Sequence, residues 1–233
     1  MPNPPAILLE DFTTLDLSTK YYSDNCLDSQ LTVANNELRC AWVSQGGKTG
    51  NRRAELAIRK VLGGGEIPRR DPVGSTRWYS WSVKHGSNWN PNDAEKSHKC
   101  VVGQFHQTSG SNPPISFEIM NNLMRLTLVT LTVPRRFYAM GAPPADWTRI
   151  VVNVKWSAGS DGFLQVWRDG VQLINYTGGT CNPGSVYDDG LNHKGWNYNP
   201  GAADGDFESG YVRDVYVKDW RIGDETNVLE DMA

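Results

Sequence analysis

The stretch Thr148-Arg-Ile-Val-Val-Asn-Val-Lys-Trp156 carries the clearest fold signal in the sequence. Successive side chains of a β-strand point to opposite faces, so residues two positions apart share a face. The apolar residues of this stretch fall on one such face: Ile150, Val152, Val154 and Trp156. The polar residues fall on the other: Arg149, Asn153 and Lys155. This alternation predicts an antiparallel strand with one face against a core.

Short β-rich runs of the same kind occur along the whole chain. Turn-forming sequences separate them, such as Gln45-Gly-Gly and Gly159-Ser-Asp-Gly. We expect strands at Ala6–Phe12, Glu37–Ser44, Arg52–Lys60, Arg77–Lys84, Lys99–Gln107, Asn122–Val133, Thr148–Trp156, Gly162–Arg168 and Gly210–Ile222. No segment keeps an uninterrupted apolar period of about 3.6 residues, so helices should be few and short. This pattern predicts an all-β sandwich or jelly roll of two antiparallel sheets.

The length of 233 residues suits a single domain, because all-β sandwiches of this size are routinely one unit. We therefore expect one domain over residues 1–233. Two stretches, Gly86–Ser97 and Gly178–Phe207, are predicted to be long loops. The second loop carries aromatic and titratable residues, as functional loops often do.

The overall charge argues against two classes of partner. With 23 basic and 26 acidic residues the formal net charge is −3, so no global basic field favours nucleic acid or an anionic membrane. No apolar run approaches the roughly 20 residues of a membrane span. The first residues, Met1-Pro-Asn-Pro-Pro, lack the basic and apolar regions of a signal peptide. A local arginine cluster could still bind an acidic glycan, whatever the net charge. We expect the protein to be a monomer.

The four cysteines, at positions 26, 40, 100 and 181, are far apart in the sequence. None forms a C-x-x-C pair, so neither a zinc site nor a thioredoxin-like site is favoured. Buried thiols and disulfides both remain open at this stage.

Three segments carry polar residues in patterns that suit a site. On a strand at Arg52–Lys60, Arg53, Glu55 and Arg59 would share the face opposite Ala54 and Leu56. A solvated salt-bridge ladder would also explain that row.

In the second segment, Gln104 and His106 would share a face while Phe105 points to the core. Gln104 can donate a hydrogen bond to a carboxylate, and neutral His106 can accept a proton. The third segment, His193-Lys-Gly-Trp-Asn-Tyr-Asn-Pro200, offers the cation of Lys194 and the phenol of Tyr198. It would otherwise be an aromatic loop that caps the sandwich.

Taken in this order, the three segments resemble the motifs of alginate lyases and of the related glucuronan and heparin lyases of the jelly-roll class. The matching residues read Arg53-Ala-Glu-Leu56, Gln104-Phe-His106 and Lys194-Gly-Trp-Asn-Tyr198-Asn199, the last with one extra residue before the tyrosine. Val154-Lys-Trp-Ser and Gly162–Gly170 look like the glucuronan lyase and heparin lyase I branch. The resemblance covers most of residues 50–222. It implies a concanavalin-like β-jelly-roll with a concave substrate groove.

The resemblance also implies a secreted polysaccharide lyase that cleaves a uronic-acid-containing glycan by β-elimination. Glucuronan is the favoured substrate, with alginate and heparin-like glycans left open. The implied catalytic residues are Arg53, Gln104, His106 and Tyr198. The implied substrate-binding residues are Glu55, Arg59, Lys194, Trp196, Asn199 and His85, of which His85 is also a reserve candidate for the base.

Other functions fit parts of the pattern. A non-catalytic carbohydrate-binding module would use the same aromatic residues and the same Gln-x-His strand, and a surface adhesin also stays open. A retaining glycoside hydrolase needs two carboxylates about 5 Å apart. Enzymes of the laminarinase type place them on a strand as Glu-x-Asp-x-x-Glu, and the nearest approach here, Glu118-Ile-Met-Asn-Asn, lacks the second carboxylate. No cofactor is expected for catalysis. Glu10 and Asp219 could contribute to a structural calcium site, although solvated acids explain them more simply.

Overall fold

The computed structural model describes residues 8–14, 21–23, 31–43, 53–58, 70–88, 100–107, 113–120, 122–183, 191–198 and 212–233. These residues form sixteen strands and one short helix. The strands are β1 (Leu8–Glu10), β2 (Tyr21–Ser23), β3 (Leu31–Ala34), β4 (Glu37–Val43), β5 (Arg53–Ile58), β6 (Arg70–Asp71), β7 (Thr76–His85), β8 (Cys100–Gln107), β9 (Ile115–Met120), β10 (Leu123–Leu128), β11 (Arg136–Gly141), β12 (Thr148–Lys155), β13 (Phe163–Arg168), β14 (Val171–Thr177), β15 (Leu191–Tyr198) and β16 (Val212–Gly223). The helix α1 spans Leu229–Met232.

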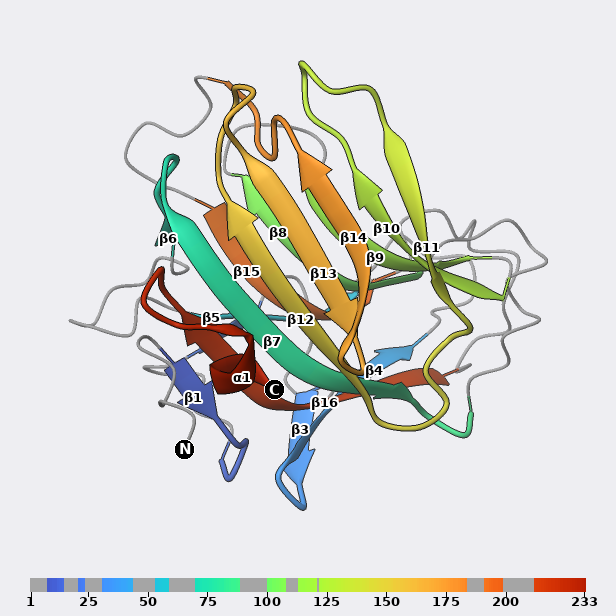
Figure 1. The fold of residues 1–233 in the computed structure, drawn as a ribbon. Coiled ribbons are helices and arrows are strands. Elements are labelled where there is room, and N and C mark those ends of the chain that lie inside the picture. Colours follow the sequence, from blue (N-terminus) through green and yellow to red (C-terminus); the bar gives the residue numbers. More distant parts are fainter. Residues whose placement is uncertain are drawn as a thin grey trace.

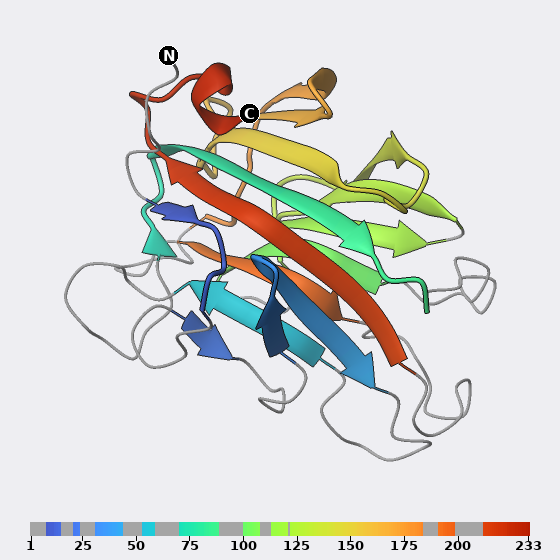
Figure 2. The same ribbon diagram turned by 90° about the horizontal axis from the view of Figure 1, so that it is seen from below.

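The strands form two antiparallel sheets that lie one above the other (Figures 1 and 2). Sheet A has the order β14-β13-β12-β7-β16-β4-β3, and β1 pairs with β16. Sheet B has the order β11-β10-β9-β8-β15-β5-β2, and β6 pairs with β15. The predicted all-β sandwich of two antiparallel sheets is therefore confirmed.

The core lies between the two sheets, where apolar side chains from alternate positions meet. All four residues predicted to face it from the stretch 148–156 are completely buried: Ile150, Val152, Val154 and Trp156. Aromatic rings join the sheets across this space. Phe105 of β8 lies 4.7 Å from the ring of Tyr79 and 5.2 Å from that of Trp156, and Trp81 meets Phe117 edge-on at 5.1 Å. Such aromatic pairs stabilise a core beyond the area that they bury.

One polar contact also ties the sheets together. The hydroxyl of Tyr79 on β7 donates to the carboxylate of Asp71 on β6 at 2.6 Å, and it accepts a hydrogen bond from Trp156 Nε1 at 3.2 Å. Asp71 is 1% exposed, and its other oxygen accepts from Arg77 Nε at 2.8 Å. Since β6 pairs with β15, this hydrogen bond fixes the position of sheet B against sheet A.

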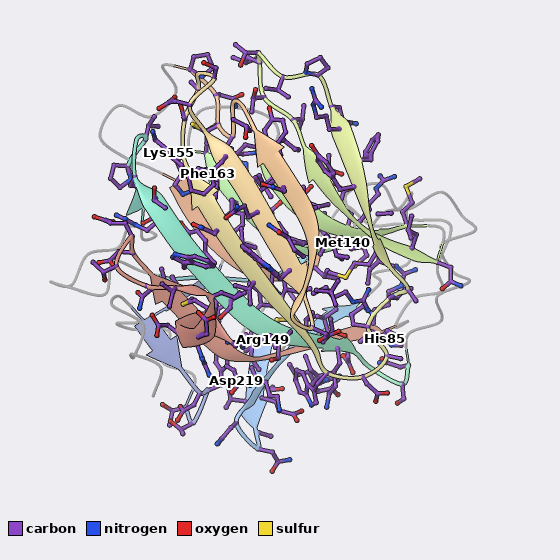
Figure 3. The ribbon with its side chains drawn as sticks, viewed as in Figure 1. His85, Met140, Arg149, Lys155, Phe163 and Asp219 are labelled. Atoms are coloured by element: carbon purple, nitrogen blue, oxygen red, sulfur yellow. The ribbon has the colours of Figure 1, made fainter. Side chains whose placement is uncertain are left out.

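Residues 229–233 are fastened to the outer face of sheet A. Arg149 donates to the carbonyl oxygens of Met232 and Asp219 at 2.6 and 2.8 Å, and Figure 3 shows Arg149 and Asp219 close to each other. Burial, with the neighbouring charge of Arg221, lowers the pKa of Arg149 to about 10. Met232 packs with Trp78 on this face. The chain itself therefore covers part of the outer face of sheet A.

The structure corrects the prediction of a long loop over Gly178–Phe207, because β15 runs through its middle. Gly195 and the asparagines of this segment have low strand propensity, and hydrogen bonds to β8 and β5 on both edges override it. The sequence analysis also missed β2, β3, β6, β9, β11 and β14. Most of these are short, or, like β9 with its buried Glu118, mix apolar and charged residues.

Three of the cysteines lie in described segments, and all three are buried: Cys40, Cys100 and Cys181. Burial raises the pKa of the Cys181 thiol to about 11. Since the thiolate is the reactive form, burial keeps Cys181 in its less reactive thiol form at neutral pH. Cys26 lies outside the described residues.

We predict that Tyr79→Phe destabilises the protein by about 1–3 kcal/mol, because Asp71 and Trp156 each lose a buried hydrogen-bond partner. Urea unfolding of the variant and the parent measures this difference. Tyr176→Phe is the matched control, since among the described residues the hydroxyl of the half-buried Tyr176 makes a single long hydrogen bond, 3.4 Å to the carbonyl of Gly179. Equal stability of the Tyr79 and Tyr176 variants would contradict the role given to Tyr79.

Candidate active site

The three segments singled out in the sequence lie on three adjacent strands of sheet B. β15 pairs with β8 on one edge and with β5 on the other. Tyr198 is directly opposite Arg53, and Lys194 is directly opposite Gln104. Directly opposed residues of an antiparallel pair have Cβ atoms about 4.5–5.5 Å apart. Arg53 and Tyr198, which are 145 positions apart in the chain, therefore meet in one patch.

The two edges of β15 differ in regularity. The pairing with β5 runs without interruption from Lys194 to Tyr198. The pairing with β8 shifts, because Lys194 pairs with Gln104 and Tyr198 with Val101, which is four residues on β15 against three on β8. This shift falls within the segment that carries one extra residue before the tyrosine. Bulges of this kind are over-represented next to active sites, where they re-aim side chains.

The core fixes which face of the patch can carry the site. Ala54, Leu56 and Phe105 point inward and are at most 1% exposed, as the alternation predicted. Gln104 and His106 therefore belong to the outer face of sheet B. Gln104 is nevertheless only 6% exposed, and His106 is half-buried.

For several predicted site residues the structure describes the backbone and not the side chain: Arg53, Glu55, Lys194, Trp196 and Tyr198. Arg59 and Asn199 lie outside the described residues. The catalytic and substrate-binding roles of all these residues remain predictions.

His85 is the predicted site residue that the structure does not bring to this patch. It ends β7, which belongs to sheet A (Figure 3). Its backbone N–H donates to the carbonyl of Pro144 at 2.8 Å, and its ring Nδ1 lies 3.0 Å from the carbonyl oxygen of Gly86. His106, which lies two residues from Gln104 on β8, is the better-placed imidazole.

Sequence reasoning missed a second group on the same outer face. Glu118 of β9 is 1% exposed and accepts hydrogen bonds from Nε and Nη2 of Arg125 at 3.1 and 3.0 Å. The hydroxyl of Ser116 donates to its other oxygen at 2.7 Å. The alternation of Ile115, Phe117 and Ile119 with these polar residues was the signal that would have revealed β9 and its outward-facing acid.

No metal site is supported by the described residues, which contain no group of three or more His, Cys, Asp or Glu placed to hold an ion. Glu10 pairs with Trp220, next to Asp219, so the two acids of the calcium hypothesis do lie on neighbouring strands. The described part of the chain offers no third acidic ligand there, and calcium enters no step below. Among the described residues no helix is long and apolar enough to cross a membrane.

Comparison with known families matches residues 15–202 to a family model described as polysaccharide lyase. The chain belongs to this polysaccharide lyase family. A search of curated proteins finds no match. The resemblance seen in the three motifs is thus confirmed at the level of the family, and the protein is an enzyme that acts on polysaccharides.

Solved structures of lyases share the fold at low sequence identity. The endo-β-1,4-glucuronan lyase of the fungus Trichoderma reesei is 15% identical, with a TM-score of 0.64 over 99% of this lyase chain and 96% of its own. An alginate lyase of polysaccharide lyase family 7 is 16% identical, with a TM-score of 0.60 over 92% and 98%. An alginate lyase from Pseudomonas aeruginosa is 16% identical, with a TM-score of 0.58 over 91% and 100%. These neighbours identify the sandwich as a jelly roll.

The register of β15 predicts that a disulfide will form in the double variant Gln104→Cys with Lys194→Cys. Directly opposed positions of antiparallel strands have Cα atoms about 4.5–5.5 Å apart, within the range of a disulfide. Mild oxidation followed by mass spectrometry of peptides detects the bond. Gln104→Cys with Tyr198→Cys is the control, since position 198 lies four residues, or about 13 Å, farther along the strand. Efficient crosslinking of the control pair alone would show that the register is wrong.

Proposed function

We propose that this lyase cleaves a uronic-acid-containing polysaccharide by β-elimination on the outer face of sheet B. The observation that carries the proposal is the pairing of Tyr198 with Arg53 and of Lys194 with Gln104 across three adjacent strands. The register brings the backbone positions of two cationic residues, Arg53 and Lys194, and of Tyr198 and Gln104 onto three adjacent strands. His106 is two residues from Gln104. Together these residue types meet the needs of an elimination.

The first need is to stabilise charge on the substrate carboxylate. Elimination removes the C5 proton of a uronate, and negative charge then builds up on the neighbouring carboxylate. Donors from Arg53 and Gln104 would neutralise that carboxylate and hold the enolate-like charge in the transition state. Gln104 suits this role because the residue is only 6% exposed, and hydrogen bonds to an ion are stronger where water is excluded.

The second need is a base for the C5 proton and an acid for the leaving C4 oxygen. We assign these roles to His106 and Tyr198. When the proton and the leaving group lie on the same side of the ring, as in glucuronate or mannuronate, Tyr198 can serve both roles. When they lie on opposite sides, as in guluronate or iduronate, His106 takes the proton and Tyr198 donates one. A free tyrosine has a pKa of about 10, so a nearby cation would have to lower the pKa of Tyr198 for it to act as a base.

The remaining predicted residues would bind the substrate chain. Trp196 lies between Lys194 and Tyr198 on β15, and it pairs with Glu55 on the neighbouring strand β5. Arg59, Lys194 and Asn199 would supply donors to further carboxylate and hydroxyl groups.

Glucuronan is our first choice of substrate. It rests on the resemblance of Val154-Lys-Trp-Ser and Gly162–Gly170 to the glucuronan lyase and heparin lyase I branch. A polymer substrate of this kind would be met outside the cell, so we propose that the enzyme acts there.

The direct test is to incubate the purified protein with glucuronan, polymannuronate, polyguluronate and heparin. β-Elimination creates a C4–C5 double bond conjugated with the carboxylate, so we expect a new ultraviolet absorbance on at least one substrate, and first on glucuronan. New reducing ends without that chromophore would indicate hydrolysis and refute the proposal. Binding without any new ends would favour a carbohydrate-binding module.

Substitutions in the patch should separate catalysis from binding. Tyr198→Phe keeps the ring and removes the exchangeable proton, so kcat should fall at least about 10²–10⁴-fold with little change in binding. Arg53→Ala and Gln104→Ala should weaken both binding and turnover, because the carboxylate is charged already in the ground state. His106→Ala should abolish activity on every substrate if His106 is the base, and reduce it only in part if it tunes Tyr198. Ordinary activity of Tyr198→Phe would refute the site assignment.

A further inference from the structure

The outer face of sheet B continues beyond β8 across β9, β10 and β11. Its residues form a transverse row that starts at Gln104. Gln104 pairs with Ser116, Ser116 pairs with Thr127, and Thr127 pairs with Phe137. A polymer bound across the strands at Gln104 would therefore lie over this row if it extended in that direction.

Arg125 is held at this end of the sheet in a defined orientation. Two of its nitrogens, Nε and Nη2, donate to one oxygen of Glu118, and its guanidinium lies 4.3 Å from the ring centre of Phe137. The side chain of Arg125 stays 21% exposed, whereas Glu118 is 1% exposed. The negative member of the pair is thus buried in the sheet and the positive member reaches the surface. Nη1 has no hydrogen-bond partner among the described residues.

Two neighbours of Arg125 add to the case for a ligand. Phe137 lies on β11, at the end of the strand order of sheet B, and is 54% exposed, and an exposed aromatic ring of this kind can stack on a sugar. Thr127 is 4% exposed, and its hydroxyl is a buried polar group without a hydrogen-bond partner in the described part of the chain. Buried polar groups are rarely left unsatisfied in the absence of a ligand or water.

We propose that Arg125 and Phe137 form a distal subsite that binds an acidic sugar unit of the polymer, with the carboxylate on Nη1 of Arg125 and the sugar against the ring of Phe137. Glu118 and Ser116 act as positioning residues, because they fix the guanidinium in place without meeting the sugar. This inference rests on the proposed function, since it assigns the substrate's negative charges to specific positions along the same face.

The distance between β8 and β10 indicates which sugar unit this subsite binds. β10 lies two strands from β8, or about 10 Å at the usual strand spacing. Arg125 is also two residues out of line with Gln104, which is in register with Thr127 through Ser116, so we assign Arg125 to a different sugar unit from the one held at Gln104. A contact of this kind strengthens ground state and transition state equally, so it lowers KM for chains long enough to reach it and leaves kcat unchanged.

The test is the dependence of kcat/KM on the length of purified oligosaccharides from the best substrate. For the parent enzyme, kcat/KM should rise at the length that first reaches the subsite. Arg125→Gln should lower kcat/KM of the oligosaccharides that reach the subsite by about tenfold, the typical effect of losing one charge-assisted hydrogen bond. Phe137→Ala should reduce it about threefold, in proportion to a weaker aromatic contact. Shorter oligosaccharides should be cleaved by both variants as by the parent.

Arg39→Gln is the matched control. It removes an arginine from the same kind of pair on the outer face of sheet A, where Arg39 lies 2.9 Å from the 8%-exposed carboxylate of Asp214. In this control, kcat/KM should depend on oligosaccharide length as in the parent. Urea unfolding measures any loss of stability in the control. Phe137→Ala leaves no buried group unpaired, so it tests the subsite even if Arg125→Gln folds poorly.

The outcomes separate this inference from the proposed function. If kcat/KM of Arg125→Gln and of Phe137→Ala depends on oligosaccharide length as in the parent, the subsite is refuted. The proposed lyase activity is unaffected by that result. A loss that is equal at all lengths also overturns the subsite, because the pair would then act only through the fold. If the parent enzyme eliminates none of the uronans, the proposed function fails. Calorimetric binding of the intact oligosaccharides to the parent and to Phe137→Ala then decides the subsite alone, and equal affinities overturn it.

Discussion

The hydrogen bonding of β15 to β8 on one edge and to β5 on the other is the constraint on which the site depends. Through it, the segments around Arg53, Gln104 and Tyr198 become neighbours, although they are widely separated in the chain. The strand has little intrinsic tendency to form, so its position follows from its two partners and from the contact of β6 with its end. The catalysis that we propose for these residues requires all three strands at once, so the proposed site depends on the assembled sheet.

The core between the sheets determines which residues the outer face can display. Phe105 packs against Tyr79 and Trp156, and this inward anchor turns Gln104 and His106 to the other side of β8. Sheet A presents a different outer face, since Arg149 and Arg221 bind the carbonyl oxygens of residues 231–233 there. The chain itself therefore covers part of the outer face of sheet A, whereas the outer face of sheet B carries Gln104, His106 and Arg125, to which we assign the polymer.

The sequence was sufficient for the fold class and for the motifs, because both depend on local alternation. The burial of Ala54, Leu56 and Phe105 follows directly from the two-residue period of a strand. Strand propensity argues against β15, where pairing partners distant in sequence override Gly195 and its asparagine neighbours. The Glu118–Arg125 pair and the placement of His85 on the other sheet depend on strand order, which no local pattern encodes. For the same reason, the sequence could propose but not position the residues of the site.

A crystal structure of the Tyr198→Phe variant with a bound uronate oligosaccharide would show where the substrate lies on the sandwich. We expect the sugar chain to cross β5, β15 and β8 on the outer face of sheet B. One carboxylate should lie within hydrogen-bond distance of both Arg53 and Gln104, with the C5 atom of that sugar facing the ring at position 198. An oligosaccharide bound on the outer face of sheet A, or one whose carboxylates meet neither residue, would contradict it.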